Sequence, residues 1–184
     1  MRHPFMQAVA AQLSEYRIAT LRYQFPYMEQ GNKRPDSLPV LLATVRSAVA
    51  TALDAAGDLP LLAGGKSMGG RMTSMAAAQA ALPGVRGLVF FGFPLHPAGQ
   101  PATERGEHLK KLTVPMLFLQ GTRDKLADLD LLRPLCGRLG RLAELHVVDG
   151  ADHSFHMLKS SGRTDTQVIA ELGQVLTAWA SRLG

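Results

Sequence analysis

The sequence predicts a single α/β domain, residues 1–184, in which helices cover both faces of a mostly parallel β-sheet. Short, almost continuously apolar segments alternate along the chain with longer segments of helical periodicity. Strands buried on both faces lack the apolar–polar alternation of a half-exposed strand, and such strands are typical of parallel sheets. The length of 184 residues fits one domain with its own core.

The N-terminal segment predicts a helix followed by a strand. Pro4 is expected near the first position of the helix, on which Phe5, Val9 and Leu13 share one face. Residues 18–25 are rich in apolar and aromatic side chains and predict a strand that ends before a proline. A polar loop follows this strand.

The rest of the chain repeats the alternation of helix and strand. Residues 38–56 predict a helix that Gly57 closes, because glycine readily adopts the backbone that ends a helix. The remaining helices are expected at residues 69–82, 106–112, 126–139 and 164–183, with a candidate break at Pro134. The remaining strands are expected at residues 59–63, 85–93, 114–120 and 143–148.

Charge and cysteine content argue against several classes of partner and compartment. The net charge is +5, but the basic residues are scattered, and only Lys33-Arg34 and Lys110-Lys111 are adjacent. We therefore expect no nucleic-acid partner. We expect no membrane partner either, because no stretch is interpreted as long and apolar enough to span a membrane, and the N-terminus lacks a signal-peptide core. The single cysteine, Cys136, precludes an internal disulfide and predicts a reducing, cytoplasmic setting.

The segment 59–70 carries the most informative motif, Gly-x-Ser-x-Gly at residues 65–69. A predicted strand precedes it and a predicted helix follows, which is the setting of a nucleophile elbow. In such a sharp turn, side chains two residues before and two residues after Ser67 would clash with the neighbouring strand and helix. Glycine at positions 65 and 69 has no side chain and so avoids this clash. Ser67 is the predicted nucleophile, and the backbone N–H of Met68 is the predicted oxyanion donor.

A phosphate-binding loop is the rival interpretation of this segment. Gly65, Lys66 and Ser67 match the end of such a motif. The motif also needs a glycine five residues before Gly65, where the chain has Pro60. The predicted strand leaves no loop to wrap a phosphate, so the elbow is favoured.

A serine nucleophile needs a base, and the base needs a carboxylate that orients it. In elbow enzymes the chain order is serine, then carboxylate, then histidine. Asp124 is the first carboxylate after the predicted strand 114–120, and His153 follows the predicted strand 143–148. Carboxyl ends of parallel strands meet at one edge of a sheet. Asp124 is therefore the predicted acid and His153 the predicted base.

Other residues compete for these roles. Asp128 and Asp130 fit the start of the next helix, and Asp152 adjoins His153 in a turn. His156 fits a helix start, and His146 lies within a predicted strand. Leu95 and His96, in the loop after strand 85–93, are predicted to line the substrate pocket.

Two further kinds of site are disfavoured. Cys136 lies in a predicted helix and is interpreted as a packed thiol rather than a nucleophile. No His, Cys or Asp cluster has metal-ligand spacing and no dinucleotide fingerprint occurs, so no metal or cofactor is expected.

The segments GGKSMGGRM, GFPLHPAGQP, VPMLFLQGTRD and GADHSF together resemble the small α/β-hydrolases related to dienelactone hydrolase. The resemblance is strongest to the branch with testis-expressed protein 30 and the third subunit of the NSL acetyltransferase complex, and it covers nearly the whole chain. It implies the α/β-hydrolase fold with Ser67, Asp124 and His153 as the triad. It also implies further N-terminal strands and a second oxyanion donor in a His-Gly-x-Gly loop. We therefore expect the natural start to lie upstream of Met1.

These patterns predict a serine hydrolase that acts on a small ester, thioester or lactone through an acyl-enzyme. The alternative is a non-catalytic interaction domain on the same fold, which the complex-subunit relatives suggest. The sequence does not indicate a particular substrate or an oligomeric state.

Overall fold

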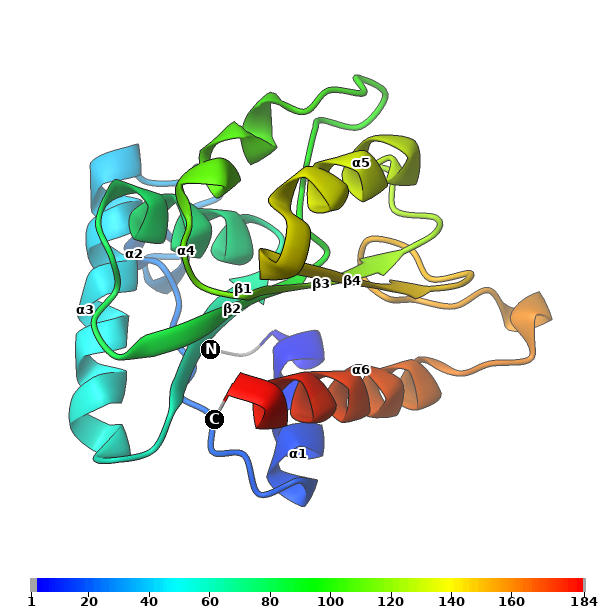
Figure 1. Ribbon diagram of the computed structural model, residues 1–184. Helices are drawn as coiled ribbons and strands as arrows, with labels where there is room; N and C mark the ends of the chain where they lie inside the picture. The colour runs from blue at the N-terminus through cyan, green and yellow to red at the C-terminus, as the bar shows by residue number, and fades with distance from the viewer. Residues whose placement is uncertain (1–2, 184) are drawn as a thin grey trace.

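A four-stranded, fully parallel β-sheet forms the centre of the protein, in the order β1-β2-β3-β4 (Figure 1). The computed structural model describes residues 3–183. The strands are β1 (Leu61–Lys66), β2 (Val85–Phe91), β3 (Met116–Gly121) and β4 (Ala143–Val148). The predicted fold class is confirmed, since each strand is linked to the next by a segment that contains helix.

Helices connect and flank these strands. The α-helices are α1 (Pro4–Glu15), α2 (Pro26–Glu29), α3 (Leu38–Ala56), α4 (Met68–Gln79), α5 (Leu129–Leu139) and α6 (Asp165–Ala180). Short 3₁₀ segments are η1 (Glu104–Lys111), η2 (Gly140–Leu142), η3 (Lys159–Ser161) and η4 (Ser181–Leu183). The predicted helix 38–56 and strand 143–148 have the observed bounds. The candidate break at Pro134 is not realised, since α5 continues through it.

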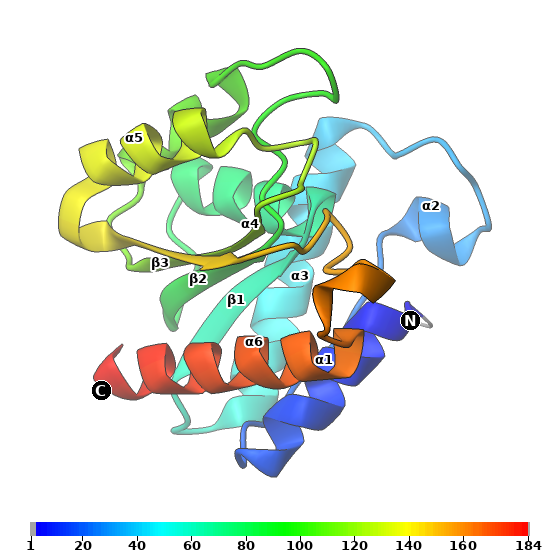
Figure 2. The same cartoon turned by 90° about the vertical axis from the view of Figure 1, so that its right-hand side faces the viewer.

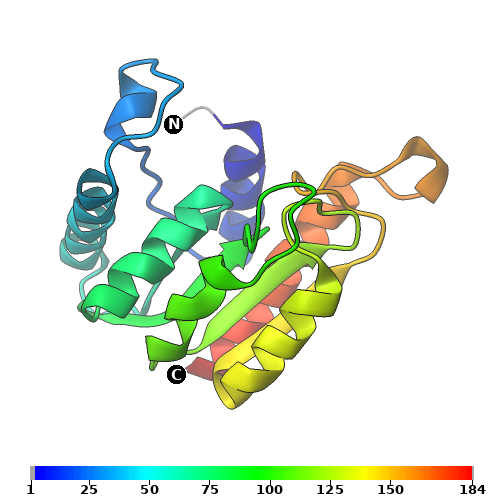
Figure 3. The ribbon, with the colours of Figure 1, turned by 90° about the horizontal axis from the view of Figure 1, so that it is seen from above.

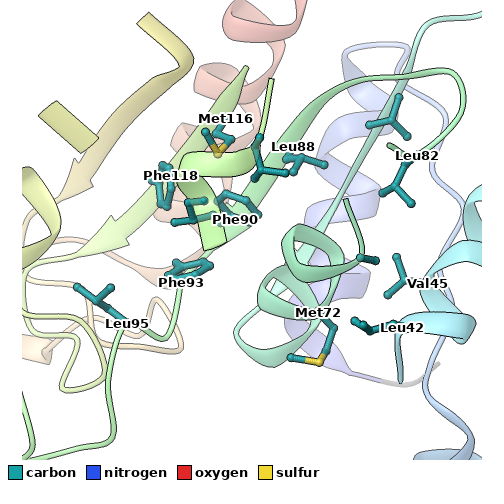
Figure 4. Packing of buried hydrophobic residues seen from close by; sticks show 14 of the residues in the cluster. Leu42, Val45, Met72, Leu82, Leu88, Phe90, Phe93, Leu95, Met116 and Phe118 are labelled. Atoms are coloured by element: carbon teal, nitrogen blue, oxygen red, sulfur yellow. The ribbon is translucent and has the colours of Figure 1, made fainter. Parts of the chain in front are cut away.

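Two apolar cores, one on each face of the sheet, hold the layers together. On one face α3, α4, η1 and α5 contribute, and Figure 4 shows Met72 of α4 near Leu42 and Val45 of α3, and Phe118 beside Phe90 of the sheet. On the other face α1 and α6 lie side by side, as Figures 1 and 2 show. In Figure 1 α5 lies above the sheet and α6 below it, and Figure 3 looks down on the α5 side, with α6 behind the sheet. Each large apolar side chain buried in this way contributes roughly 1.5–3 kcal/mol.

The strand predicted over residues 18–25 is wrong. The segment is extended but pairs with no strand among residues 3–183, and the short helix α2 follows it. A strand needs a neighbour for its backbone N–H and C=O groups, which the apolar character of the segment does not provide. Phe25 is nevertheless buried in the core with α3 and α4, whereas Leu21 is 45% exposed, so burial accounts for only part of the apolar pattern.

Helix α3 corrects a second expectation. By length and composition alone it is long and apolar enough to cross a membrane, with 19 residues and a mean hydropathy of 1.4. Four of its side chains, Leu41, Leu42, Val45 and Val49, are buried in the core. Only 17% of its apolar window is buried inside the protein, and a single helix of this length and composition does not by itself assign a membrane location.

Candidate active site

Ser67 lies at the turn between β1 and α4, in a strained backbone conformation. It directly follows Lys66, the last residue of β1, and it is the N-cap of α4 with φ 51° and ψ −120°. A positive φ is uncommon for a residue with a side chain and costs on the order of 1–3 kcal/mol. The Ser67 N–H donates to the Phe91 carbonyl over 3.0 Å, which fastens the turn to β2. This geometry is that of a nucleophile elbow.

The glycines that this turn requires differ in part from those expected. A Cβ on Gly65 would lie 3.0 Å from the Gly69 carbonyl carbon, so Gly65 is needed as predicted. A Cβ on Gly69 would meet nothing within 4 Å, so the expected clash at Gly69 is wrong. The close approach falls on Gly70, where a Cβ would lie 2.7 Å from the Gly65 carbonyl oxygen. The first turn of α4 presents Gly70, and not Gly69, to the strand.

A chain of hydrogen bonds joins the three predicted site residues. The Ser67 hydroxyl lies 2.8 Å from His153 Nε2, and His153 Nδ1 lies 2.7 Å from Asp124 Oδ2. A carboxylate can only accept, so Nδ1 carries the proton and Nε2 is free to accept from the serine. Ser67 and His153 are 86 positions apart in sequence, and Asp124 and His153 are 29 positions apart. They meet because β1, β3 and β4 end at the same edge of the sheet.

The Asp124 carboxylate is fully buried and is surrounded by donors. Its side chain has 0% exposure. Oδ1 accepts from the Leu126 N–H over 2.8 Å, and Oδ2 accepts from both His153 and the Gln120 side-chain amide. The Gln120 carbonyl in turn accepts from the Phe93 N–H over 3.0 Å. A buried charge is tolerated when its oxygens are satisfied in this way.

The loop that carries His153 is packed tightly against two strand ends. A Cβ on Gly92 would lie 3.3 Å from His153 Nδ1, so the imidazole rests on the backbone that follows β2. A Cβ on Gly121 would lie 2.2 Å from the Ala151 carbonyl oxygen. Phe155 adopts φ 61° in the same loop and is buried. The ring orientation of His153 is therefore set by close backbone contacts.

The competing acids and bases occupy other positions. Asp128 caps α5 by accepting from the Asp130 N–H, as its alternative interpretation predicted. Asp152 accepts from the backbone N–H groups of Ser154 and His156 and so holds the loop. The His156 ring pairs with Asp165, and the His146 ring pairs with Glu171. Within residues 3–183, none of these four side chains makes a hydrogen bond to Ser67.

Leu95 and His96 are buried rather than open to solvent, with exposures of 0% and 3%. The Asp128 N–H donates to His96 Nε2 over 2.8 Å, and His96 Nδ1 lies 2.8 Å from the Pro97 carbonyl. The imidazole therefore ties this loop to the start of α5. Lining of the substrate pocket by Leu95 and His96 stays a prediction.

Two further nucleophile candidates lack the features of Ser67. Burial raises the pKa of the Cys136 thiol to about 11, so it stays protonated, as its interpretation as a packed thiol requires. Ser74 contacts a histidine ring, His108 Nε2, at 2.7 Å, but it is fully buried and its hydroxyl donates to the Arg71 carbonyl.

Sequence reasoning missed the contacts of Gln120 and Lys66 within the site. Gln120 was assigned only to the end of a strand, and Lys66 only to the motif around Ser67. The sequence did offer one signal for Gln120, an amide side chain near the end of a strand that is otherwise apolar. A buried amide needs polar partners, so such a residue is expected to make hydrogen bonds. No local pattern indicated that Lys66 reaches the His153 loop.

Two hollows on the protein lie away from these residues. One, of about 540 Å³, lies beside α3 and is lined by residues that include Leu21, Tyr23, Val40 and Thr44. Another lies against β1 and is lined by residues that include Leu61, Leu62 and Thr73. Ser67, Asp124 and His153 line neither hollow. Ser67 itself is half-buried, and the His153 side chain is 23% exposed, so the site opens at the surface.

Comparison with known proteins supports the fold assignment. The sequence profile of the alpha/beta hydrolase domain family matches residues 1–181. An alpha-beta serine hydrolase homologue from Coxiella burnetii is 20% identical, with a TM-score of 0.74 over 97% of this chain and 76% of that one. A serine hydrolase without a lid from Xanthomonas campestris is 20% identical, with a TM-score of 0.72 over 97% and 75%. The esterase domain of a Rhodothermus marinus protein is 21% identical, with a TM-score of 0.68 over 98% and 80%.

Proposed function

The chain belongs to the alpha/beta hydrolase family, and from that premise we propose that it is a serine hydrolase that cleaves small carboxylic esters, thioesters or lactones. The observation that carries the proposal is the hydrogen-bonded series Ser67–His153–Asp124 at the strained turn after β1. Such a series activates a serine hydroxyl, which is otherwise a weak nucleophile.

The first half of the reaction forms an acyl-enzyme. Ser67 Oγ bonds to the substrate carbonyl carbon while His153 Nε2 takes the hydroxyl proton. Asp124 stabilises the imidazolium that results, and the N–H of Met68, at the first position of α4, faces the developing oxyanion. The tetrahedral intermediate then collapses, and His153 returns the proton to the leaving alkoxide or thiolate.

The second half releases the acid. Water gives a proton to His153 and attacks the acyl carbon, and the second collapse returns the proton to Ser67 Oγ. Ser67 is half-buried at the surface, and the loop 94–103 is short. This open arrangement favours small acyl groups over long lipid chains. A dienelactone-hydrolase-like preference and a cytoplasmic location remain part of this proposal.

Labelling with a fluorophosphonate probe tests the proposal, because the probe reacts only with an activated serine. Wild type is expected to be labelled, and Ser67→Ala should abolish labelling. Ser74→Ala is the matched control, since Ser74 also contacts a histidine ring and is fully buried, but no carboxylate among residues 3–183 is hydrogen-bonded to that ring. Labelling that survives Ser67→Ala would contradict the proposal. A folded but unlabelled wild type would favour the non-catalytic interaction domain.

A further inference from the structure

Lys66 links the strand that carries the nucleophile to the loop that carries the histidine. It is the last residue of β1 and the neighbour of Ser67. Its Nζ donates to the backbone carbonyl oxygen of His153 over 2.6 Å, across 87 positions in sequence. An ammonium donor makes a shorter and stronger hydrogen bond than a neutral amide. The contact therefore spans the two elements whose separation sets the Ser67–His153 distance.

Two aromatic rings hold the ammonium group in place. Nζ lies 5.1 Å from the ring centroid of Phe5 and 5.7 Å from that of Phe155. The two rings stack on each other at 5.4 Å with an interplanar angle of 17°. Both distances are within the range of cation–π attraction. The rings of Phe5 and Phe155 thus form an aromatic cage around the ammonium group, which brings together α1, the end of β1 and the His153 loop. The lysine therefore has little freedom to leave the His153 carbonyl.

The surroundings of Lys66 fit a charge held for a structural purpose. Burial lowers its pKa, while the carboxylates of Asp124 and Asp152 act in the opposite direction. Withdrawing a lysine from water is unfavourable unless specific contacts compensate. The cage and the His153 carbonyl supply those contacts. A plain packing role would be served better by an apolar side chain of the same length.

We propose that Lys66 is a positioning residue, which holds the backbone of His153 so that the imidazole stays in line between Asp124 and Ser67. This inference rests on the proposed hydrolase function, and it adds a residue to the Ser67–His153–Asp124 series. Lys66 does not touch the reacting atoms in this arrangement. A shift of about 1 Å in the imidazole is enough to cost on the order of 100-fold in rate.

Lys66→Met is the test variant, because methionine keeps the length and can pack on the Phe5 and Phe155 rings through its sulfur. Lys66→Arg restores a donor to the cage. Lys110→Met is the matched control, since Lys110 is an exposed lysine paired with Glu107 on η1. For hydrolysis of p-nitrophenyl acetate, Lys66→Met should lower kcat about 10- to 100-fold with KM within about twofold. Lys66→Arg should recover part of that loss, and Lys110→Met should behave as wild type.

A measurement independent of turnover separates this inference from the proposed function. The proton on His153 Nδ1 should give a downfield NMR signal, assigned by its absence in His153→Asn. The signal should be lost or shifted in Lys66→Met and kept in Lys110→Met, while the melting temperature is unchanged or higher. An unchanged signal and an unchanged kcat in Lys66→Met would overturn the inference. So would an equal loss in Lys66→Met and Lys66→Arg, which would indicate packing alone. If wild type is not labelled at Ser67, the hydrolase proposal fails, and the NMR comparison still decides the role of Lys66.

Discussion

At the scale of single residues, the site depends on polar side chains that lie behind the three predicted catalytic side chains. Gln120 is fully buried and bonds at both ends of its amide, to Asp124 and to the Phe93 N–H. It therefore joins the predicted acid to the loop after β2. The amide orients the Asp124 oxygen that accepts from His153, since both donors meet at Oδ2.

Replacing Gln120 by leucine should damage both stability and activity. Leucine has a similar size but leaves the Phe93 N–H without a partner, which costs about 1–3 kcal/mol. The fluorophosphonate labelling rate should also fall, because Asp124 loses one of its donors. Urea unfolding and labelling kinetics check this, with exposed Gln79→Leu, at the end of α4, as a control. Wild-type values for Gln120→Leu would show that these two bonds contribute nothing.

At the scale of elements, the contact between β1 and α4 determines how the serine is presented. The strand and the helix meet through glycines, and the close approach falls on Gly65 and Gly70. Gly70 is buried, and a Cβ there would also lie 3.1 Å from a ring carbon of Phe90. The turn therefore has no room for a methyl group on the inner side of the helix.

Adjacent substitutions in α4 should have opposite effects. Gly69→Ala should leave stability unchanged or raise it by up to about 1 kcal/mol, because alanine is the better helix former and meets nothing. Gly70→Ala should lower stability by about 1–3 kcal/mol through overpacking and should slow labelling of Ser67. Urea unfolding of the two variants measures the difference. Equal destabilisation by both would contradict the assignment of the close approach to Gly70.

At the scale of the whole molecule, the 3₁₀ segment η1 docks on α4 through a half-buried histidine. His108 contacts Ser74, and burial together with the positive charge of Arg71 lowers the pKa of His108 to about 4 from 6.5. The charge of Lys111 acts in the same direction. The imidazole is thus neutral in the folded protein at pH values where it would be protonated in the unfolded chain.

Acid should therefore weaken the fold over a defined range of pH. Between pH 6.5 and about 4 the unfolded state binds more protons at this position, so the free energy of unfolding falls as the pH falls. The contribution is fully present above pH 6.5 and is lost by about pH 4. Urea unfolding, followed by fluorescence of the single, buried Trp179, should show a shallower decline for His108→Gln than for wild type. Parallel declines in the two proteins would refute this role of His108.

The sequence by itself determined the alternation of helix and strand and the three side chains of the hydrogen-bonded series Ser67–His153–Asp124. Both features can be predicted from the sequence because they depend on local signals. These signals are apolar runs, turn residues, and the position of Asp124 and His153 just after a predicted strand. The strand expected at 18–25 failed because a strand also needs a partner, and pairing is a property of the assembled sheet.

Only the tertiary structure decided which neighbours complete the site. Lys66 reaches a carbonyl 87 residues away, and the glycine that α4 requires is set by the angle at which helix meets strand. Leu95 and His96 are buried because their loop folds back onto the start of α5, and their lining of the substrate pocket stays a prediction. Such contacts join segments that are distant in sequence, so no local pattern of residues encodes them.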